Sequence, residues 1–329
     1  MKQVLTMSVN FMQDTVFRGR IVYLFKAYFM KVSGFTYVRN GLQYDYPFLE
    51  AIRSILPICD EIAVVVGDST DGTREAVEAL NDPRIKIVDT VWDNKDLKGR
   101  RYAVQSNTGL DHVTGDWAFH IQADEVVHEE DLPLIREAME KYADDRSVEG
   151  FLFRFINFFG DYRHWGPSRR FHQHEIRIVR NDPKVRAYRD SQGFRIFNDP
   201  ADQWNEKGRK LKVVPLAARI FHYSYARNPF VQRKRQIEFE KGYLEEKAVD
   251  EKFAATKDLA YDYRNIDYLK LFNGEHPAVM RDRISRQDWN FEYDPTHHNM
   301  SPKEKLMKWL EDLTGRQFFI YKNYKKIRR

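Results

Sequence analysis

The sequence has only one cysteine, Cys59, among its 329 residues. One cysteine excludes an internal disulfide framework and a cysteine-rich zinc site, and its simplest interpretation is a reducing compartment. No apolar run reaches the roughly 18 residues that a membrane-spanning helix needs, because Lys26 and Lys31 interrupt the best candidate. Internal repeats and the GxxxxGK[ST] motif are also missing from the sequence, which argues against a repeat protein and a Walker-type NTPase.

The sequence also lacks a strong excess of charge of either sign. Its 54 Lys and Arg residues against 49 Asp and Glu give a net charge of +5. This balance does not call for a nucleic-acid partner, and none is expected. We expect a cytoplasmic protein, soluble or peripheral on the inner face of a membrane. The basic tail is predicted to contact anionic lipid headgroups, with a solvated tail as the alternative; the residues concerned are Tyr321, Lys322, Lys325, Lys326, Arg328 and Arg329.

Between residues 35 and 142, strand-like and helix-like segments alternate. Such alternation favours a mostly parallel sheet covered by helices, and ligands bind such sheets at the carboxyl ends of the strands. The predicted strands are residues 35–38, 61–66, 85–88 and 117–121, and the predicted helices are residues 48–56, 72–80, 101–110 and 132–142.

Later residues follow a different pattern. Strands are predicted at 151–159, 174–180 and 213–223, and the chain becomes helical and charged after residue 229. We therefore expect an N-terminal extension (1–33), a catalytic domain (34–226) and a helical C-terminal region with the basic tail (227–329). A capping box at Ser301 and Glu304 predicts one helix there. Its apolar face is expected to pack inward through Leu306, Trp309, Leu310 and Leu313.

Two polar loops follow predicted strands. Residues 67–73 (GDSTDGT) follow the strand 61–66, and residues 122–125 (QADE) follow the strand 117–121. Taken alone, the first is an ordinary turn before a helix, and the second is a solvated acidic turn or helix cap. Carboxylate oxygens are also the ligands that Mg²⁺ and Mn²⁺ prefer. Two such loops at one sheet edge favour a nucleotide and a divalent cation.

The order of these segments resembles a family 2 glycosyltransferase. The resemblance rests on FTYVRN, the helix to Leu56, DEIAVVVGDSTDGT, DPRIKIV and GDWAFHIQADE, and it is specific over residues 34–139 and weaker to about 225. It implies a Rossmann-like α/β glycosyltransferase-A fold, here with a C-terminal helical extension. The resemblance further implies a nucleotide-sugar donor, Mn²⁺ or Mg²⁺, a glycan or glycolipid acceptor, inversion, and a role in cell-surface polysaccharide or lipopolysaccharide synthesis.

The resemblance also implies roles for single residues. Asp124 stands at the metal-binding acid of the DXD-like motif, while Gln122 replaces its first aspartate and Gly67 stands where an aspartate usually follows the strand. Glu125 and His222 are expected in or near the metal shell, although a partly buried histidine is an equal alternative for His222. The residues expected to bind the nucleotide sugar are Arg39, Asp68, Asp71, Gln122 and Asp124.

Asp190 is the predicted catalytic base, in the segment YRDSQG. Arg189 and Arg195 are expected to flank it and keep it ionised. Glu175 and Glu149 are the competing acids, and an ordinary turn acid paired with an arginine is the structural alternative for Asp190.

Two other functions remain open. A sugar-phosphate nucleotidyltransferase would share the nucleotide-binding sheet, but the segment Arg39-Asn40-Gly41 is too short for its glycine-rich loop. A non-catalytic binder of an anionic polymer would use the positive charge and the basic tail, and its binding would depend steeply on salt.

Overall fold

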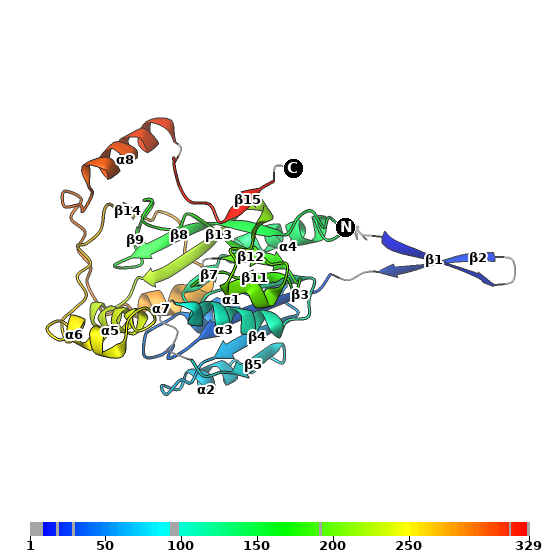
Figure 1. Cartoon of the computed structure of the whole chain (residues 1–329), viewed down its shortest axis with the longest axis horizontal. Helices are drawn as coiled ribbons and strands as arrows, with labels where there is room; N and C mark the ends of the chain where they lie inside the picture. The colour runs from blue at the N-terminus through cyan, green and yellow to red at the C-terminus, as the bar shows by residue number, and fades with distance from the viewer. Residues whose placement is uncertain are drawn as a thin grey trace.

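A computed structural model describes residues 9–17, 20–27, 30–92, 99–190, 193–315 and 317–327 (Figure 1). The predicted N-terminal extension contains an antiparallel pair of strands, β1 (Val9–Phe17) and β2 (Arg20–Ala27). The main sheet begins immediately afterwards, at β3 (Val32–Val38), so residues 32 and 33 already belong to it.

The first half of the main sheet is parallel. Strand β3 lies between β4 (Glu61–Val66) and β6 (Trp117–His120), and β5 (Ile85–Asp89) follows β4, all in parallel register. Every residue of β4 is buried, as the continuous apolar run EIAVVV predicts for a strand covered on both faces. The connecting helices are α1 (Phe48–Ile55), α2 (Thr73–Glu78), α3 (Arg100–Asp111) and α4 (Leu132–Lys141). The predicted α/β class with a mostly parallel core is therefore confirmed.

Antiparallel strands extend the sheet beyond β6. Strand β10 (His174–Arg180) pairs antiparallel with β6 and with β8 (Gly150–Phe159), and the long β13 (Arg209–Tyr225) runs parallel to β8. The short β7 (Glu125–Val127) pairs with β13 so that Glu125 lies opposite His222. The remaining short strands are β9 (His164–Trp165), β11 (Val185–Ala187), β12 (Phe194–Ile196), β14 (Lys270–Leu271) and β15 (Tyr324–Lys326).

Side chains that alternate along the strands build an apolar layer on each face of the sheet. Val64 and Phe119 belong to the layer that contains residues of α1 and α4, whereas Ala63 and Ala118 belong to the layer that contains residues of α3. This is the two-residue period of strands that are buried on both faces. The sheet is thus held rigidly between helices, and the loops at its strand ends have a fixed base.

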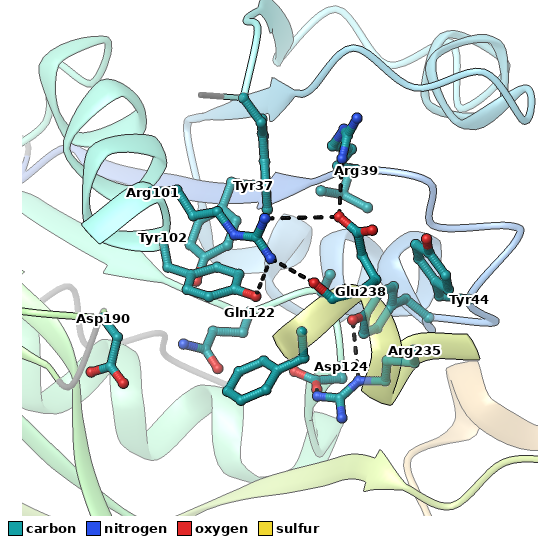
Figure 2. A pocket seen from close by; sticks show the side chains of 15 residues that line it. Tyr37, Arg39, Tyr44, Arg101, Tyr102, Gln122, Asp124, Asp190, Arg235 and Glu238 are labelled. Carbon is teal, nitrogen blue, oxygen red and sulfur yellow. Dashed lines mark hydrogen bonds and ion pairs between the residues drawn. The ribbon is translucent and has the colours of Figure 1, made fainter. Parts of the chain in front are cut away.

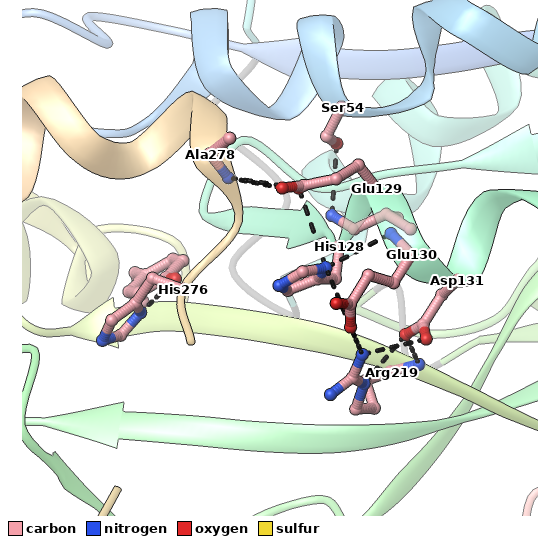
Figure 3. Close-up of polar contacts among 10 residues, drawn as sticks. Ser54, His128, Glu129, Glu130, Asp131, Arg219, His276 and Ala278 are labelled. Carbon is pink, nitrogen blue, oxygen red and sulfur yellow. Dashed lines mark hydrogen bonds and ion pairs between the residues drawn. The ribbon is translucent and has the colours of Figure 1, made fainter. Parts of the chain in front are cut away.

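A polar cluster fastens the segment after β7 to its surroundings (Figure 3). Asp131 accepts hydrogen bonds from the backbone and the side chain of Arg219 on β13, at 2.8 and 3.0 Å. Glu129 accepts from the backbone N–H of Ala278, and Ser54 of α1 accepts from that of Val127. These acids have partners within the protein, so the cluster holds the chain together where β7 leads into α4.

The C-terminal region contains α5 (Pro229–Glu240), α6 (Glu246–Phe253), α7 (Arg281–Ser285) and α8 (Pro302–Thr314). The predicted capping box of α8 is confirmed: Ser301 accepts from the Glu304 backbone, and the Glu304 carboxylate accepts from the Ser301 backbone. The expected inward packing of α8 is wrong, because Leu306, Trp309 and Leu313 are 56%, 59% and 69% exposed.

The basic tail forms part of the sheet. Lys325 and Lys326 lie in β15, which pairs parallel with β13, and Arg328 and Arg329 lie outside the described residues. None of the helices in the described ranges is long and apolar enough to cross a bilayer.

Candidate active site

A pocket opens where β3 and β6 end, as expected for a parallel sheet (Figure 2). Strand β3 supplies Tyr37 and leads to Arg39, and the turn after β6 supplies Gln122 and Asp124. Helices α3 and α5 close the pocket from two further sides. Their contributions, and that of the loop before α3, were not predicted from the sequence; they are Trp92, Arg101, Tyr102, Arg235, Glu238 and Phe239.

Asp124 is a buried carboxylate at this pocket, 6% exposed. Its Oδ2 lies 3.6 Å from Nε2 of His222 and 3.8 Å from Nη2 of Arg235. Burial raises the pKa of Asp124, but the interactions with His222 in its charged form and with Arg235 and Arg227 outweigh it and hold that pKa well below its usual range. Asp124 is therefore ionised at neutral pH.

The hydrogen bonds around His222 determine which ring nitrogen carries the proton. The side-chain amide of Asn157 donates from Nδ2 to the carbonyl of His172 over 2.9 Å, so its Oδ1 faces Nδ1 of His222 at 2.8 Å. An amide oxygen only accepts, so Nδ1 carries a proton, and in the neutral ring Nε2 is the nitrogen with the lone pair. In that form two acceptors, Nε2 and the Asp124 carboxylate, face each other.

This pair of acceptors has the chemistry of a cation site. A metal-binding histidine commonly donates its other N–H to a fixed oxygen, as His222 does to Asn157. Carboxylate oxygen and imidazole nitrogen together suit Mn²⁺. Among the described residues, no three His, Cys, Asp or Glu side chains converge on one point, so the protein offers two ligands here. Further positions would be left for oxygens of a bound ligand.

Glu125 does not take part in this pair, which corrects its expected place in the metal shell. Its carboxylate is fully buried and accepts from Nε and Nη2 of Arg177 over 2.6 and 2.5 Å. The backbone N–H of Gln122 donates to it as well, over 3.1 Å. Neighbouring acids in sequence therefore have different partners: Asp124 faces the pocket, and Glu125 neutralises a buried guanidinium.

Replacing Glu125 with glutamine should destabilise the fold by about 3 kcal/mol or more, because the buried Arg177 would lose the carboxylate that is hydrogen-bonded to it. The measurement is the free energy of unfolding in urea. Glu140→Gln is the matched control, since Glu140 forms an exposed ion pair with Arg136 on α4 and should change stability by less than about 1 kcal/mol. Equal losses in the two variants would contradict the assignment.

Arg39 and the aromatic rings form the far wall of the pocket. Arg39 contacts Asp68 at 2.8 Å and Glu238 at 3.1 Å, and Asp68 also accepts from the backbone of Trp92. The Arg101 guanidinium lies 5.5 Å from the centre of the Trp92 ring. Asp68 does not line the pocket itself, which corrects its expected place there; it holds Arg39 and Trp92, which do.

Asp71 is not a pocket residue, which corrects its expected role in donor binding. Its carboxylate accepts from the backbone of Thr73 at the start of α2 and from that of Gln43, at 3.1 and 2.7 Å. Asp71 therefore connects two loops and caps a helix.

Asp190 lies on the side of the pocket away from Arg39 (Figure 2). The Tyr243 hydroxyl donates a hydrogen bond to Oδ2 of Asp190 over 2.8 Å. The buried Oδ1 has no hydrogen-bond partner among the described residues. The expected pairing with Arg195 is wrong, because Arg195 bonds to Asn323 and Tyr321. Asp190 also borders a second cavity, beside Trp204. One carboxylate oxygen of Asp190 is thus available to a ligand.

The two competing acids lie elsewhere. Glu149 forms a two-hydrogen-bond ion pair with Arg209, at 2.8 and 2.6 Å. Glu175 lines a separate cavity beneath the C-terminal segment, with Nδ1 of His172 at 3.2 Å. Burial raises the pKa of Glu175 to about 7, with Arg177 opposing the rise and Glu125 adding to it.

The raised pKa of Glu175 predicts how stability depends on pH. Between the ordinary value of 4.5 and about 7, the folded protein holds this proton and the unfolded chain releases it. Stability should therefore fall as pH rises through that window. Glu175→Gln removes this dependence, so the variant should be more stable than wild type at pH 8, by about 2 kcal/mol, and similar to it at pH 4.5. Urea unfolding at several pH values measures the difference; parallel curves for the two proteins would refute the shift.

The fold and the pocket together define a class of protein. A parallel sheet carries at its strand ends an aromatic and arginine-rich pocket, a buried acid–histidine pair and a facing carboxylate. Residues 46–203 match the family model Glycosyl transferase family 2, so the chain carries a glycosyltransferase domain of family 2.

Three solved structures are among those to which the chain is similar. TarS from S. aureus, residues 1–349, is 15% identical over 69% of this chain and 73% of its own, with a TM-score of 0.39. The mannosyltransferase PcManGT from Pyrobaculum calidifontis, in complex with GDP-Man and Mn²⁺, is 24% identical over 40% of this chain and 36% of its own (TM-score 0.30). Glucosyl-3-phosphoglycerate synthase from Mycobacterium tuberculosis, in complex with Mg²⁺ and UDP, is 17% identical over 39% and 44% (TM-score 0.27). Curated protein sequences gave no match.

Proposed function

We propose that this glycosyltransferase moves a sugar from a nucleotide-diphosphate donor to an acceptor hydroxyl, with a divalent cation and with inversion at the anomeric carbon. One observation carries the proposal. At one pocket, the ionised Asp124 lies 3.6 Å from Nε2 of His222, the ring nitrogen that does not face Asn157, and the available carboxylate oxygen of Asp190 lies at the same cavity. A cation site and a base at one cavity are what a single displacement needs.

Asp124 and His222 would hold the cation through Oδ2 and Nε2. When bound, the cation supplies a Lewis acid that neutralises negative charge developing on the leaving diphosphate. Arg235 lies beside Asp124 and adds positive charge on the same side of the pocket. These residues therefore favour the charge distribution of the transition state over that of the bound donor.

The nucleoside half of the donor would lie against the rings of Tyr37, Trp92 and Tyr102, where aromatic faces suit a planar base. Gln122 can donate to or accept from a ribose hydroxyl. Arg39 is held by Asp68 and Glu238, so its orientation is already set before the donor binds.

Asp190 would act as the general base. Its Oδ1 accepts the acceptor's hydroxyl proton as that oxygen forms a bond to the anomeric carbon and the bond from this carbon to the diphosphate oxygen breaks. Tyr243 fixes the carboxylate through Oδ2 and leaves Oδ1 for the acceptor. One displacement from the face opposite the diphosphate inverts the configuration.

We propose a glycan or glycolipid acceptor of cell-surface polysaccharide or lipopolysaccharide synthesis, a role supported only by the family resemblance. The test is a panel of nucleotide sugars with Mn²⁺ or Mg²⁺, read out as nucleoside diphosphate release with and without candidate acceptors. We expect release with one class of donor, stimulated by acceptor. Pyrophosphate release from a nucleoside triphosphate and a sugar phosphate would instead identify a nucleotidyltransferase. Salt-sensitive binding of an anionic polymer without turnover would identify a non-catalytic binder.

A further inference from the structure

Helix α8 is amphipathic, and its apolar side faces outward. Leu306, Trp309 and Leu313 recur three and four residues apart, which places them on one face of the helix. Their side chains are 56%, 59% and 69% exposed, and Phe319, just beyond the helix, is 95% exposed. We call Leu306, Trp309 and Leu313 the α8 apolar face. Large apolar side chains gathered on one exposed surface mark an interaction site.

The charged side of α8 is what attaches it to the rest of the protein. Glu311 is only 10% exposed and accepts from Nε of Arg169 over 3.0 Å. Arg169 also donates to the carbonyl of Phe318, and the Lys308 amine lies 4.7 Å from the centre of the Tyr268 ring. Polar contacts therefore orient the helix with its apolar face away from the body.

The helix is also preformed. Its capping box at Ser301 satisfies the first turn, and Gly315, with φ of 64°, ends it in the left-handed conformation. In Figure 1, α8 stands apart from the sheet, at the margin of the molecule. A docking surface that is already ordered loses little conformational entropy when a partner binds.

The charge of the surrounding segment indicates the chemistry of the partner. Residues 301–329 contain nine Lys and Arg and three Asp and Glu, a net charge of +6, whereas the whole chain carries +5. The positive charge of the protein is thus concentrated in the segment of the sequence that contains α8. A second copy would bring two such segments together and is disfavoured by like-charge repulsion. An anionic lipid surface is complementary both to the charge and to the exposed apolar and aromatic side chains.

We propose that the α8 apolar face docks the protein on an anionic bilayer surface, with Leu306, Trp309 and Leu313 at the boundary between headgroups and acyl chains. Basic residues of the same segment contact the headgroup phosphates. This inference is independent of the proposed function, because it concerns a surface outside the pocket and is tested without donor or acceptor.

The test is co-sedimentation of the full chain with vesicles of phosphatidylcholine alone or mixed with phosphatidylglycerol. We expect binding to the mixed vesicles only, with a blue shift of tryptophan emission that Trp309→Phe removes. The triple variant Leu306→Ser, Trp309→Ser, Leu313→Ser should bind at least about tenfold more weakly. The variant Lys303→Gln, Lys305→Gln, Lys325→Gln should bind about a hundredfold more weakly at low salt.

The matched control is Leu259→Ser, Leu271→Ser, which removes two leucines that are 57% and 56% exposed outside α8. This variant should bind vesicles as wild type does, and urea unfolding should give similar midpoints for all variants. Three results would overturn the proposal. They are equal binding of the triple serine variant and wild type, failure of wild type to bind the mixed vesicles, and a wild-type dimer that the serine variant converts to monomer without any vesicle binding.

Discussion

Asp190→Asn should lower kcat by about 10² or more while leaving the dissociation constant of the nucleotide-sugar donor unchanged. Asparagine keeps the size of the side chain and can still pair with Tyr243, but its amide cannot take a proton from the acceptor. The substitution should therefore slow the chemical step and leave donor binding unchanged. Steady-state kinetics with saturating donor and acceptor measures kcat, and calorimetry with the donor alone measures affinity.

Glu175→Gln is the control for this experiment. Glu175 is also buried and acidic, but it lines a different cavity, so its replacement should leave kcat near that of wild type. Tyr243→Phe removes the hydrogen bond to Oδ2 of Asp190 and should give an intermediate loss. If Asp190→Asn were near normal and Glu175→Gln inactive, the base would be Glu175 and the proposed role of Asp190 would be wrong.

Removing Asp124 should be more damaging still. Asp124→Asn should lower kcat by about 10³ or more, because several kcal/mol of charge stabilisation at the leaving diphosphate would be lost and each 1.4 kcal/mol is about tenfold in rate. Excess chelator should abolish the activity of wild type, and added Mn²⁺ should restore it. Calorimetric titration of Mn²⁺ in the presence of a nucleoside diphosphate measures cation binding directly.

Asp131→Asn provides the comparison for this second experiment. Asp131 is a buried acid as well, but it pairs with Arg219 outside the pocket, so its replacement should not change the Mn²⁺ affinity (Figure 3). Full wild-type activity in excess chelator would exclude the cation from the mechanism and leave Arg235 as the cationic group beside Asp124.

Much of the fold could be predicted from the sequence because its signals are local. The run EIAVVV is typical of a strand buried on both faces, and the polar residues that follow it and its neighbours are then expected at one edge of the sheet. Arg39, Gln122 and Asp124 were placed at a ligand pocket by this reasoning, and they line one. The helix start at Ser301 could be predicted because a capping box involves only residues three apart.

The site residues and helix orientation that could not be predicted depend on contacts between distant parts of the chain. Glu125 and Arg177 are 52 residues apart, and nothing near QADE indicates that one of the two acids is neutralised by an arginine. Arg235 and Glu238 were missed because α5 has little apolar periodicity and was assigned to a region beyond the catalytic domain. The orientation of α8 could not be predicted either, because amphipathicity reveals that a face is apolar but not what covers it.

The division of roles between Asp124 and Glu125 has a consequence for how this sequence can drift over evolutionary time. Position 124 is constrained by its proposed role as a cation ligand, so its acid should persist wherever the transfer reaction persists. Position 125 is constrained mainly by Arg177, since a buried charge is tolerated as a pair and penalised alone. Positions 125 and 177 should therefore change together, as an ion pair or as two apolar residues, whereas position 124 should vary independently of both. Two adjacent positions of one motif would then show different patterns of substitution among related sequences.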